Sequence, residues 1–218
     1  MKKNLLFVCL SILGSMTLFA QTVAGPQVVH TTEKSAIHVP PQVNAVALKK
    51  IYSNLGTKTD LYNDTNGWLL AGPNSLGSAL LEFVAMPFTP KSNSTVEQVQ
   101  VAVHYLGSGA NQVNLSIYAD SGGAPGTLLA GPVTVTNLPE SGTCCALAVA
   151  SFTPVAVTAG TQYWVTGDTP LSGTGSDFTG TWSWVTKDLG EWGDGSPYGW
   201  SVLPVDGLPA GEVLGTIP

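Results

Sequence analysis

The stretch that decides the fold is a run in which apolar and polar side chains largely alternate, Val96-Glu97-Gln98-Val99-Gln100-Val101-Ala102-Val103-His104-Tyr105. A period of two places one set of side chains on one face of a strand and the other set on the opposite face. The run therefore predicts a half-buried strand, with His104 on its polar face. After turn-forming residues at 107–111 the alternation resumes over 113–117, and the two segments together predict a hairpin.

Other segments with strand character follow at uneven spacing along the chain. They cover 80–88, 133–135, 146–152, 162–166, 181–186, 200–203 and 212–217. Turns rich in glycine and proline separate them, and no segment longer than a single turn has a helical period. The pattern predicts an all-β protein, an antiparallel two-sheet β-sandwich of jelly-roll type, with a closed barrel as the second choice.

The N-terminus has the pattern of a secretory signal peptide. Lys2 and Lys3 precede an apolar run over 5–13 that is too short to cross a bilayer, and the small residue Ala20 stands at the expected cleavage point. We expect a signal peptide at 1–20, a leader or linker at 21–50 and a β-sandwich domain at 51–218, secreted to the extracellular space or the periplasm. The end at Pro218 carries no apolar segment or sorting motif, which favours free secretion or loose surface retention.

The charge of the chain argues against two classes of partner. The sequence contains no arginine, and the part that follows residue 20 has six lysines and fourteen acidic residues, a net charge of −8. Nucleic acids and anionic membranes are repelled by such a balance. We therefore expect no nucleic-acid partner and no membrane insertion after the signal peptide is removed.

Several short motifs, taken in order, carry a resemblance to a known family. They are Tyr52-Ser53-Asn54-Leu55-Gly56, Gly67-Trp68, Phe88-Thr89-Pro90, Leu115-Ser116-Ile117-Tyr118, Asp120-Ser121-Gly122-Gly123-Ala124-Pro125-Gly126 and Ala159-Gly160-Thr161-Gln162-Tyr163-Trp164-Val165. From about residue 51 to its end, the chain resembles the choice-of-anchor R domain family of bacterial exported proteins. The resemblance implies an extracellular β-sandwich without an established biochemical role, whose members differ in how they are attached to the cell.

The only cysteines beyond the signal peptide are the neighbours Cys144 and Cys145. In an oxidising compartment they can form a disulfide between adjacent residues, which would stiffen the turn that follows 138–142. Two reduced thiols beside a strand are an equal alternative, and pairing between chains is a third. The chain has no Cys-x-x-Cys spacing, so thiol–disulfide enzymology is not expected.

Acidic and polar residues supply no complete metal site or catalytic set. The stretch 60–67 offers oxygen ligands for a structural Ca²⁺, but it lacks the full calcium-loop pattern, and Asx turns explain it equally well. A glycan hydrolase needs two carboxylates, for which Glu82 and Glu191 are candidates, although Glu82 is expected on the solvent face of an edge strand. A Ser-His-Asp triad would have to use His104. We expect no cofactor and no enzymatic activity.

An aromatic cluster near the C-terminus is the strongest indication of binding. Trp182 and Trp184 share a strand face and are expected in the core, whereas the glycine-rich stretch 190–199 is expected to be a loop. Ligand-binding candidates are therefore Trp192 first, then Tyr198 and Trp200. The leading hypothesis is a non-catalytic module that binds a carbohydrate or another surface polymer. The alternatives are a structural or surface-display protein without a small ligand, and a glycan-active hydrolase.

Overall fold

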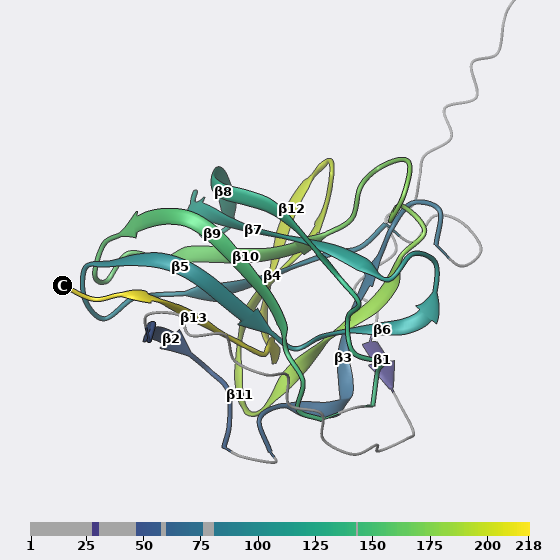
Figure 1. Ribbon diagram of the computed structural model, residues 1–218, viewed down its shortest axis with the longest axis horizontal. Helices are drawn as coiled ribbons and strands as arrows, with labels where there is room; N and C mark the ends of the chain where they lie inside the picture. Colours follow the sequence, from purple (N-terminus) through teal and green to yellow (C-terminus); the bar gives the residue numbers. More distant parts are fainter. Residues whose placement is uncertain (1–27, 31–46, 58–59, 76–80, 143) are drawn as a thin grey trace, which may run out of the picture.

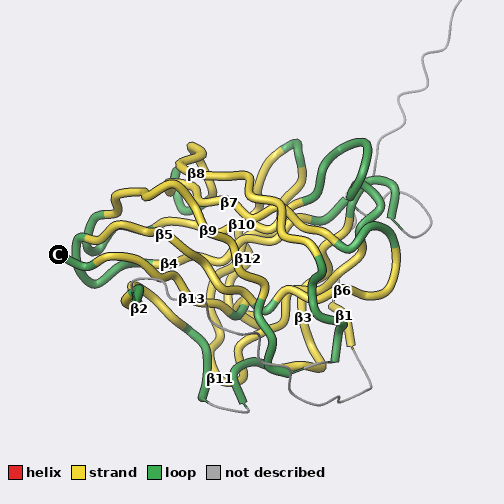
Figure 2. Tube along the Cα trace, viewed as in Figure 1, coloured by secondary structure: helices red, strands yellow, loops and turns green. Residues whose placement is uncertain are grey.

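The computed structural model describes residues 28–30, 47–57, 60–75, 81–142 and 144–218, and these residues form β-strands joined by turns and loops (Figures 1 and 2). The strands are β1 (Val28–His30), β2 (Lys49–Ser53), β3 (Asn63–Ala71), β4 (Phe83–Phe88), β5 (Ser94–Val101), β6 (Val103–Ser108), β7 (Gln112–Asp120), β8 (Pro125–Thr136), β9 (Ala148–Val157), β10 (Tyr163–Asp168), β11 (Thr179–Ser196), β12 (Gly199–Pro209) and β13 (Gly211–Thr216). Among these residues, no helix is long and apolar enough to cross a membrane.

The described strands form two antiparallel sheets. The large sheet has the order β1-β3-β11-β4-β10-β7-β8, with β12 and β6 also paired to β11, and the small sheet has the order β2-β13-β5-β9. In Figure 1, β2, β5 and β13 lie at the left, near the C-terminus. The predicted all-β, antiparallel two-sheet sandwich is confirmed, and the closed barrel given as second choice is not what forms.

The main hydrophobic core lies between the two sheets. On the large sheet, alternate residues of β4, β7 and β10 point inward, and on the small sheet alternate residues of β5 and β9 do so. The buried inward residues include Val84, Met86, Phe88, Val99, Val101, Leu115, Ile117, Ala150, Phe152 and Val165. The residues between them on β4, β7 and β10 point to the far side of the large sheet. Ala85, Ser116, Trp164 and Thr166 on that side are also buried.

The run that decides the fold is two strands rather than one. Its first part is β5 in the small sheet, and its last part begins β6, which pairs with β11 of the large sheet. The buried Ala102 stands between them, with its backbone N–H bonded to the carbonyl of Ala210 at 3.0 Å. The predicted hairpin between 96–105 and 113–117 is wrong, because β7 pairs with β10 and β8 instead.

The corner at Ala102 also overturns the expected position of His104. This side chain is only 1% exposed, since on β6 it faces a second, smaller cluster of buried residues instead of solvent. That cluster consists of Tyr62, Ala102, Cys144, Val185, Leu208 and Ala210, with Leu55, Leu61, Cys145 and Leu147 packed against it.

Two stretches expected to lack regular structure contain strands. Residues 190–199, expected to be a loop, contain the end of β11, a two-residue turn and the start of β12, and the two strands pair up to Ser196 and Gly199. Within the stretch expected to be a leader, β1 pairs with β3. The predicted signal peptide at 1–20 lies outside the described residues.

Candidate functional site

The structure places the first ligand-binding candidate, Trp192, inside the protein. Its side chain is 2% exposed, and its ring stacks on that of Trp68 with centroids 3.9 Å apart and planes 16° apart. Trp68 also contacts Trp184, with ring centroids 5.1 Å apart. A ring enclosed in this way has no free face for a ligand, so the expectation that Trp192 lies in an exposed loop is wrong.

The other two candidates lie on the β11–β12 hairpin at accessible positions. Tyr198 is at the hairpin tip and is 81% exposed, the highest value among the exposed large hydrophobic residues described. Trp200 is half-buried at the start of β12 and pairs with Gly195 of β11. These two aromatic side chains are the ones from the predicted set that can contact a ligand.

Two glycines of β11 form the floor on which Trp200 lies. A Cβ atom on Gly193 would stand 3.3 Å from Cε3 of Trp200 and 2.9 Å from the Cβ of Ala85, and one on Gly195 would overlap the six-membered ring of Trp200. The ring therefore lies close over the backbone of the strand. β12 also lies close to β4.

We expect Gly195→Ala to displace Trp200 from this floor, because the added methyl group and the indole ring would occupy the same space. Near-ultraviolet circular dichroism and tryptophan fluorescence would report the changed environment. Gly190→Ala on the same strand is the matched control, since its Cβ would meet only the methyl end of Leu208 at 3.3 Å. Equal spectra for wild type and Gly195→Ala would contradict this placement of Trp200.

A row of side chains runs from Trp200 across the outward face of the large sheet. Residues that are directly opposite in antiparallel strands point to the same face. By register, Trp200 on β12 lies opposite Gly195 on β11, which lies opposite the buried Phe83 on β4. The β4–β10 pairing ends at Val84 and Gly167, and the next residue of β10, Asp168, continues the row to Asn114 on β7 and Thr134 on β8. Five strand spacings of about 4.8 Å give the row a length of about 24 Å.

The far half of this row is a chain of hydrogen bonds. Thr134 Oγ1 donates to Asn114 Oδ1 at 2.9 Å, and Asn114 Nδ2 donates to Asp168 Oδ1 at 3.2 Å. Burial raises the pKa of Asp168 to about 6, and the hydrogen bond from Asn114 opposes that shift. The row thus joins an aromatic end to an end that presents amide, hydroxyl and carboxyl groups.

A neighbouring carboxylate, Asp120, holds this face together. Its Oδ1 accepts hydrogen bonds from Trp164 Nε1 at 2.8 Å and Gln162 Nε2 at 3.2 Å, and its Oδ2 accepts one from the backbone N–H of Gly123 at 3.0 Å. Trp164 is fully buried, as expected for a structural residue. Asp120 therefore fixes the turn after β7 to the indole of β10.

The acidic residue singled out in the sequence, Glu82, is buried rather than on a solvent face. It is 4% exposed, forms an isolated bridge with Ala71, and shares a side-chain hydrogen bond with Asp194 of β11. Burial, together with Asp194, raises the pKa of Glu82 to about 8, and burial also raises that of Asp194. At neutral pH the two carboxyl groups therefore share a proton.

Glu82, the first of the two hydrolase candidates, is buried, whereas a glycosidase presents its carboxyl groups to the substrate. Such enzymes hold two carboxyl groups about 5 Å or about 6.5–9.5 Å apart, to admit the sugar or a water molecule. The other hydrolase candidate, Glu191, is exposed on β11.

The stretch considered for Ca²⁺ contains an Asx turn. Asn63 Oδ1 accepts hydrogen bonds from the backbone N–H groups of Thr65 and Asn66, both at 3.0 Å, and from Thr65 Oγ1 at 2.8 Å. Within the ranges that the structure describes, no three His, Cys, Asp or Glu side chains come together in a way that could hold a metal ion.

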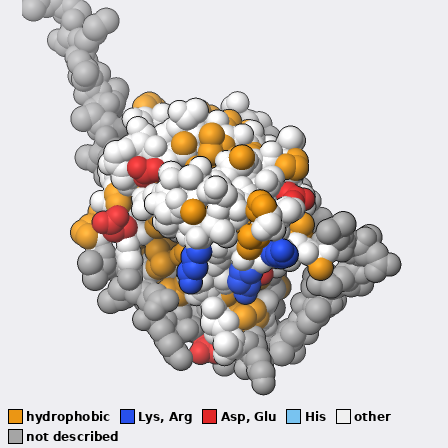
Figure 3. All heavy atoms as spheres, turned by 90° about the vertical axis from the view of Figure 1, so that its left-hand side faces the viewer, with side chains coloured by type: hydrophobic (Ala, Val, Ile, Leu, Met, Phe, Trp, Pro, Cys, Tyr) orange, Lys and Arg blue, Asp and Glu red, His pale blue; other side chains and the backbone are white. Residues whose placement is uncertain are grey.

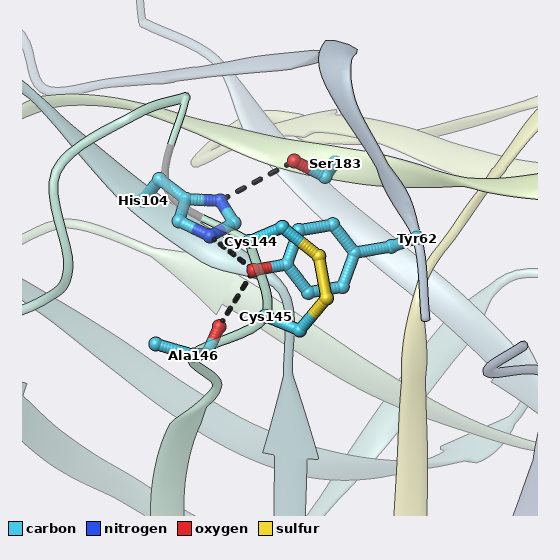
Figure 4. Close-up of a disulfide and its surroundings, with 6 residues drawn as sticks. All are labelled: Tyr62, His104, Cys144, Cys145, Ala146 and Ser183. Carbon is cyan, nitrogen blue, oxygen red and sulfur yellow. Dashed lines mark hydrogen bonds between the residues drawn. A yellow bond between two sulfur atoms is a disulfide. The ribbon is translucent and has the colours of Figure 1, made fainter. Parts of the chain in front are cut away.

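The two adjacent cysteines form a disulfide that lies beside Tyr62 and His104 (Figure 4). Tyr62 Oη donates to the carbonyl oxygen of Ala146 at 2.9 Å. It therefore accepts from His104 Nε2–H at 3.0 Å, which leaves Nδ1 to accept from the Ser183 hydroxyl at 3.3 Å. Burial lowers the pKa of His104 to about 4, so the ring is neutral at physiological pH.

The lysine side chains that the structure describes gather at one end of the molecule. Figure 3 shows lysine side chains grouped on the end that carries the C-terminus. The lysine side chains that the structure describes are Lys49 and Lys50 of β2 and Lys91 between β4 and β5, and Lys50 Nζ pairs with Glu212 Oε2 at 2.8 Å. The row on the large sheet contains a carboxyl group and no lysine.

Comparison of the chain with protein-family models, with curated proteins and with solved structures finds no match. The resemblance to choice-of-anchor R domains therefore rests on the motifs quoted from the sequence.

Sequence reasoning missed the polar half of the row and the Glu82–Asp194 pair. Asn114 and Asp168 belong to strands that are far apart in the chain, and only the order of strands in the sheet brings them together. The alternation of 113–117 does place Asn114 opposite the core face, which is the one local signal for its outward position.

Proposed function

We propose that the protein is an exported, non-catalytic module that binds an extended polysaccharide or a similar surface polymer along the outward face of its large sheet. The observation that carries the proposal is the pairing of Tyr198 and Trp200 with a row of hydrogen-bonding groups. Aromatic faces pack on the apolar faces of sugar rings, while amide, hydroxyl and carboxyl groups bond to sugar hydroxyls. Trp200 and the Thr134–Asn114–Asp168 chain supply both kinds of contact.

The dimensions of the face favour a linear ligand over a small compact one. The row crosses the strands over about 24 Å. It ends on β8, beside a groove of about 440 Å³ between the edge strands β8 and β9, lined by residues 129–133 and 151–155. A chain of several sugar rings can lie along such a row, whereas a single ring would contact only one end of it.

The charge distribution favours a neutral polymer. Asp168 and Asp120 lie on or beside the row, and the described lysine side chains stand at the end that carries the C-terminus. An anionic polymer on this face would meet like charge, and none of the lysine side chains that the structure describes lies there to oppose it. We therefore expect neutral glycans to bind more tightly than uronic-acid or phosphate polymers.

Loss of either accessible aromatic ring is expected to weaken polymer binding at least about tenfold, a change of about 1.4 kcal/mol in binding free energy. Tyr198→Ala and Trp200→Ala would be tested by affinity electrophoresis against soluble β-glucan, mannan and xylan, with polygalacturonate as the anionic comparison. Leu171→Ala is the matched control, because Leu171 is also exposed, at 55%, but lies outside the hairpin.

The same experiment separates the alternatives. A surface-display protein without a ligand would bind none of these polymers, and binding that both aromatic substitutions leave unchanged would contradict the proposed face. A glycan-active hydrolase would release reducing ends from a polymer that it binds, which a reducing-sugar assay detects. The module proposed here is retarded by the polymer in the gel and releases no reducing ends from it.

A further inference from the structure

The disulfide between Cys144 and Cys145 joins neighbours and so does not connect distant parts of the fold. A disulfide stabilises chiefly by closing a long loop in the unfolded chain, and a bond between adjacent residues closes almost none. The bond also lies within one connection, between β8 and β9, and crosses no strand. The disulfide therefore does not stabilise the fold by linking distant segments. Any effect that it has must act on the residues around it.

Those surroundings are the second cluster of buried residues. Cys144 is 8% exposed and packs with Tyr62, Val185 and Leu208. Cys145 is only half-buried at the rim of the same cluster. One sulfur of the pair is thus enclosed, and the residue that carries the other is reached by solvent.

The backbone next to the disulfide is held by a buried polar network. The carbonyl of Ala146 accepts the Tyr62 hydroxyl, which is bonded in turn to His104 and, through it, to Ser183 of β11. Figure 4 shows these groups in a continuous line beside the two sulfur atoms. Any movement of Cys145 that displaces Ala146 acts directly on this network, because the two residues are adjacent.

We propose that Cys144–Cys145 is a site of reversible reduction by a dithiol, and that its redox state controls how the 144–146 segment packs on Tyr62 and His104. A thiolate of the reductant attacks the sulfur of Cys145, forming a mixed disulfide and releasing Cys144 as a thiolate that takes up a proton. The second thiol of the reductant then attacks its own sulfur in the mixed disulfide and releases Cys145 as a thiol. In total the protein gains two electrons and two protons, and the dithiol becomes a disulfide.

Reduction changes the packing because two sulfur atoms that are not bonded need more space than two that are. Interiors are close-packed, so the second cluster cannot absorb the change without moving its neighbours. The movement is expected at the 144–146 segment and at Tyr62, whose hydroxyl donates to the carbonyl oxygen of Ala146. The outward row on β7 and β10 is not in contact with this cluster and keeps its structure.

The test uses the folded, secreted chain under native conditions. The protein is titrated with dithiothreitol, the reaction is quenched with iodoacetamide, and the mass of the protein is measured. Amide hydrogen exchange is measured on parallel samples. We expect two carbamidomethyl groups without denaturant, and exchange at 102–105 and 144–148 at least about tenfold faster. Exchange at 114–118 and 163–168 stays unchanged, and oxidation by oxidised dithiothreitol restores the original pattern.

A variant without the disulfide tests the effect on packing separately from the access of a reductant to the sulfur atoms. The double substitution C144S/C145S should show the fast exchange at 102–105 and 144–148 with no reductant present. Thiols that react only in denaturant would overturn the proposal. So would a reduced chain, or the double variant, that exchanges like the oxidised protein, and so would loss of protection over the whole domain.

Discussion

Replacing Trp192 by alanine is expected to lower the free energy of unfolding by about 3–5 kcal/mol, the usual cost of removing a large buried aromatic side chain. Trp192 is enclosed in the core and stacked on Trp68 at 3.9 Å, and Trp68 also contacts Trp184. The substitution would leave a cavity against the ring of Trp68. Urea denaturation of wild type and Trp192→Ala, followed by circular dichroism, gives the difference directly.

Tyr198→Ala is the matched comparison, because it removes an aromatic ring six residues away on the same hairpin that is 81% exposed. Its free energy of unfolding should stay within about 0.5 kcal/mol of wild type, as is usual for surface substitutions. A small effect of Trp192→Ala, or equal effects of the two substitutions, would contradict the buried position of Trp192. The prediction also means that lost binding in Trp192→Ala would report unfolding rather than a ligand contact.

Raising the pH from 6.5 to 8 is expected to lower the free energy of unfolding by about 2 kcal/mol. The pKa of Glu82 is about 8 in the folded chain, against an ordinary value of 4.5. Between these values the folded chain keeps a proton that the unfolded chain has released, so stability falls with rising pH by about 1.4 kcal/mol per unit. The contribution is complete below pH 4.5 and is lost as the pH passes through 8.

The window from pH 6.5 to 8 isolates Glu82 from two other groups. His104 has its pKa lowered to about 4 from 6.5, so it reduces stability only as the pH falls below 6.5. Asp168, with its pKa raised to about 6, contributes stability that is mostly lost before the window begins. Asp194 shares the proton of Glu82 and titrates with it as one pair.

Glu82→Gln should abolish this pH dependence. The amide has nearly the shape of the protonated acid and can still donate to Asp194, but it does not titrate. Glu191→Gln, an exposed position on β11, is the control and should retain the wild-type slope. Denaturation curves at several pH values measure all three proteins. A flat wild-type profile, or an unchanged slope in Glu82→Gln, would show that the buried pair is not as described.

Most of the fold was predicted from the alternation of apolar and polar residues. The predictions from this pattern that were wrong have identifiable causes. Alternation identified strands such as β5 because the small sheet buries one face, whereas β4 and β10 of the large sheet are buried on both faces. It could not locate the corner at Ala102, since the residues on both sides of the corner are buried and the pattern continues through it. His104 was therefore assigned to the polar face of a single strand.

The prediction for the site was wrong where glycine residues were taken to indicate a loop. Gly193 and Gly195 are strand residues, and they are glycine because Trp200 lies over their backbone. Local sequence does not separate this use from the flexibility of a turn. Tyr198 and Trp200 were nevertheless in the predicted set, because the aromatic cluster itself is visible in the sequence. The partners of Glu82 and Asn114 depend on strand order, which no local pattern contains.

The most direct test of polymer binding on the outward face is to follow the indole N–H signals of the six tryptophans by ¹H–¹⁵N NMR during titration with the tightest-binding neutral glycan. Assignment follows from single Trp→Phe variants. Binding along the row from Trp200 predicts a concentration-dependent shift of the Trp200 signal, while the signals of the buried Trp68, Trp182 and Trp192 stay in place. A titration that shifts Trp192 and leaves Trp200 unmoved, or one that moves no signal for any polymer, would contradict it.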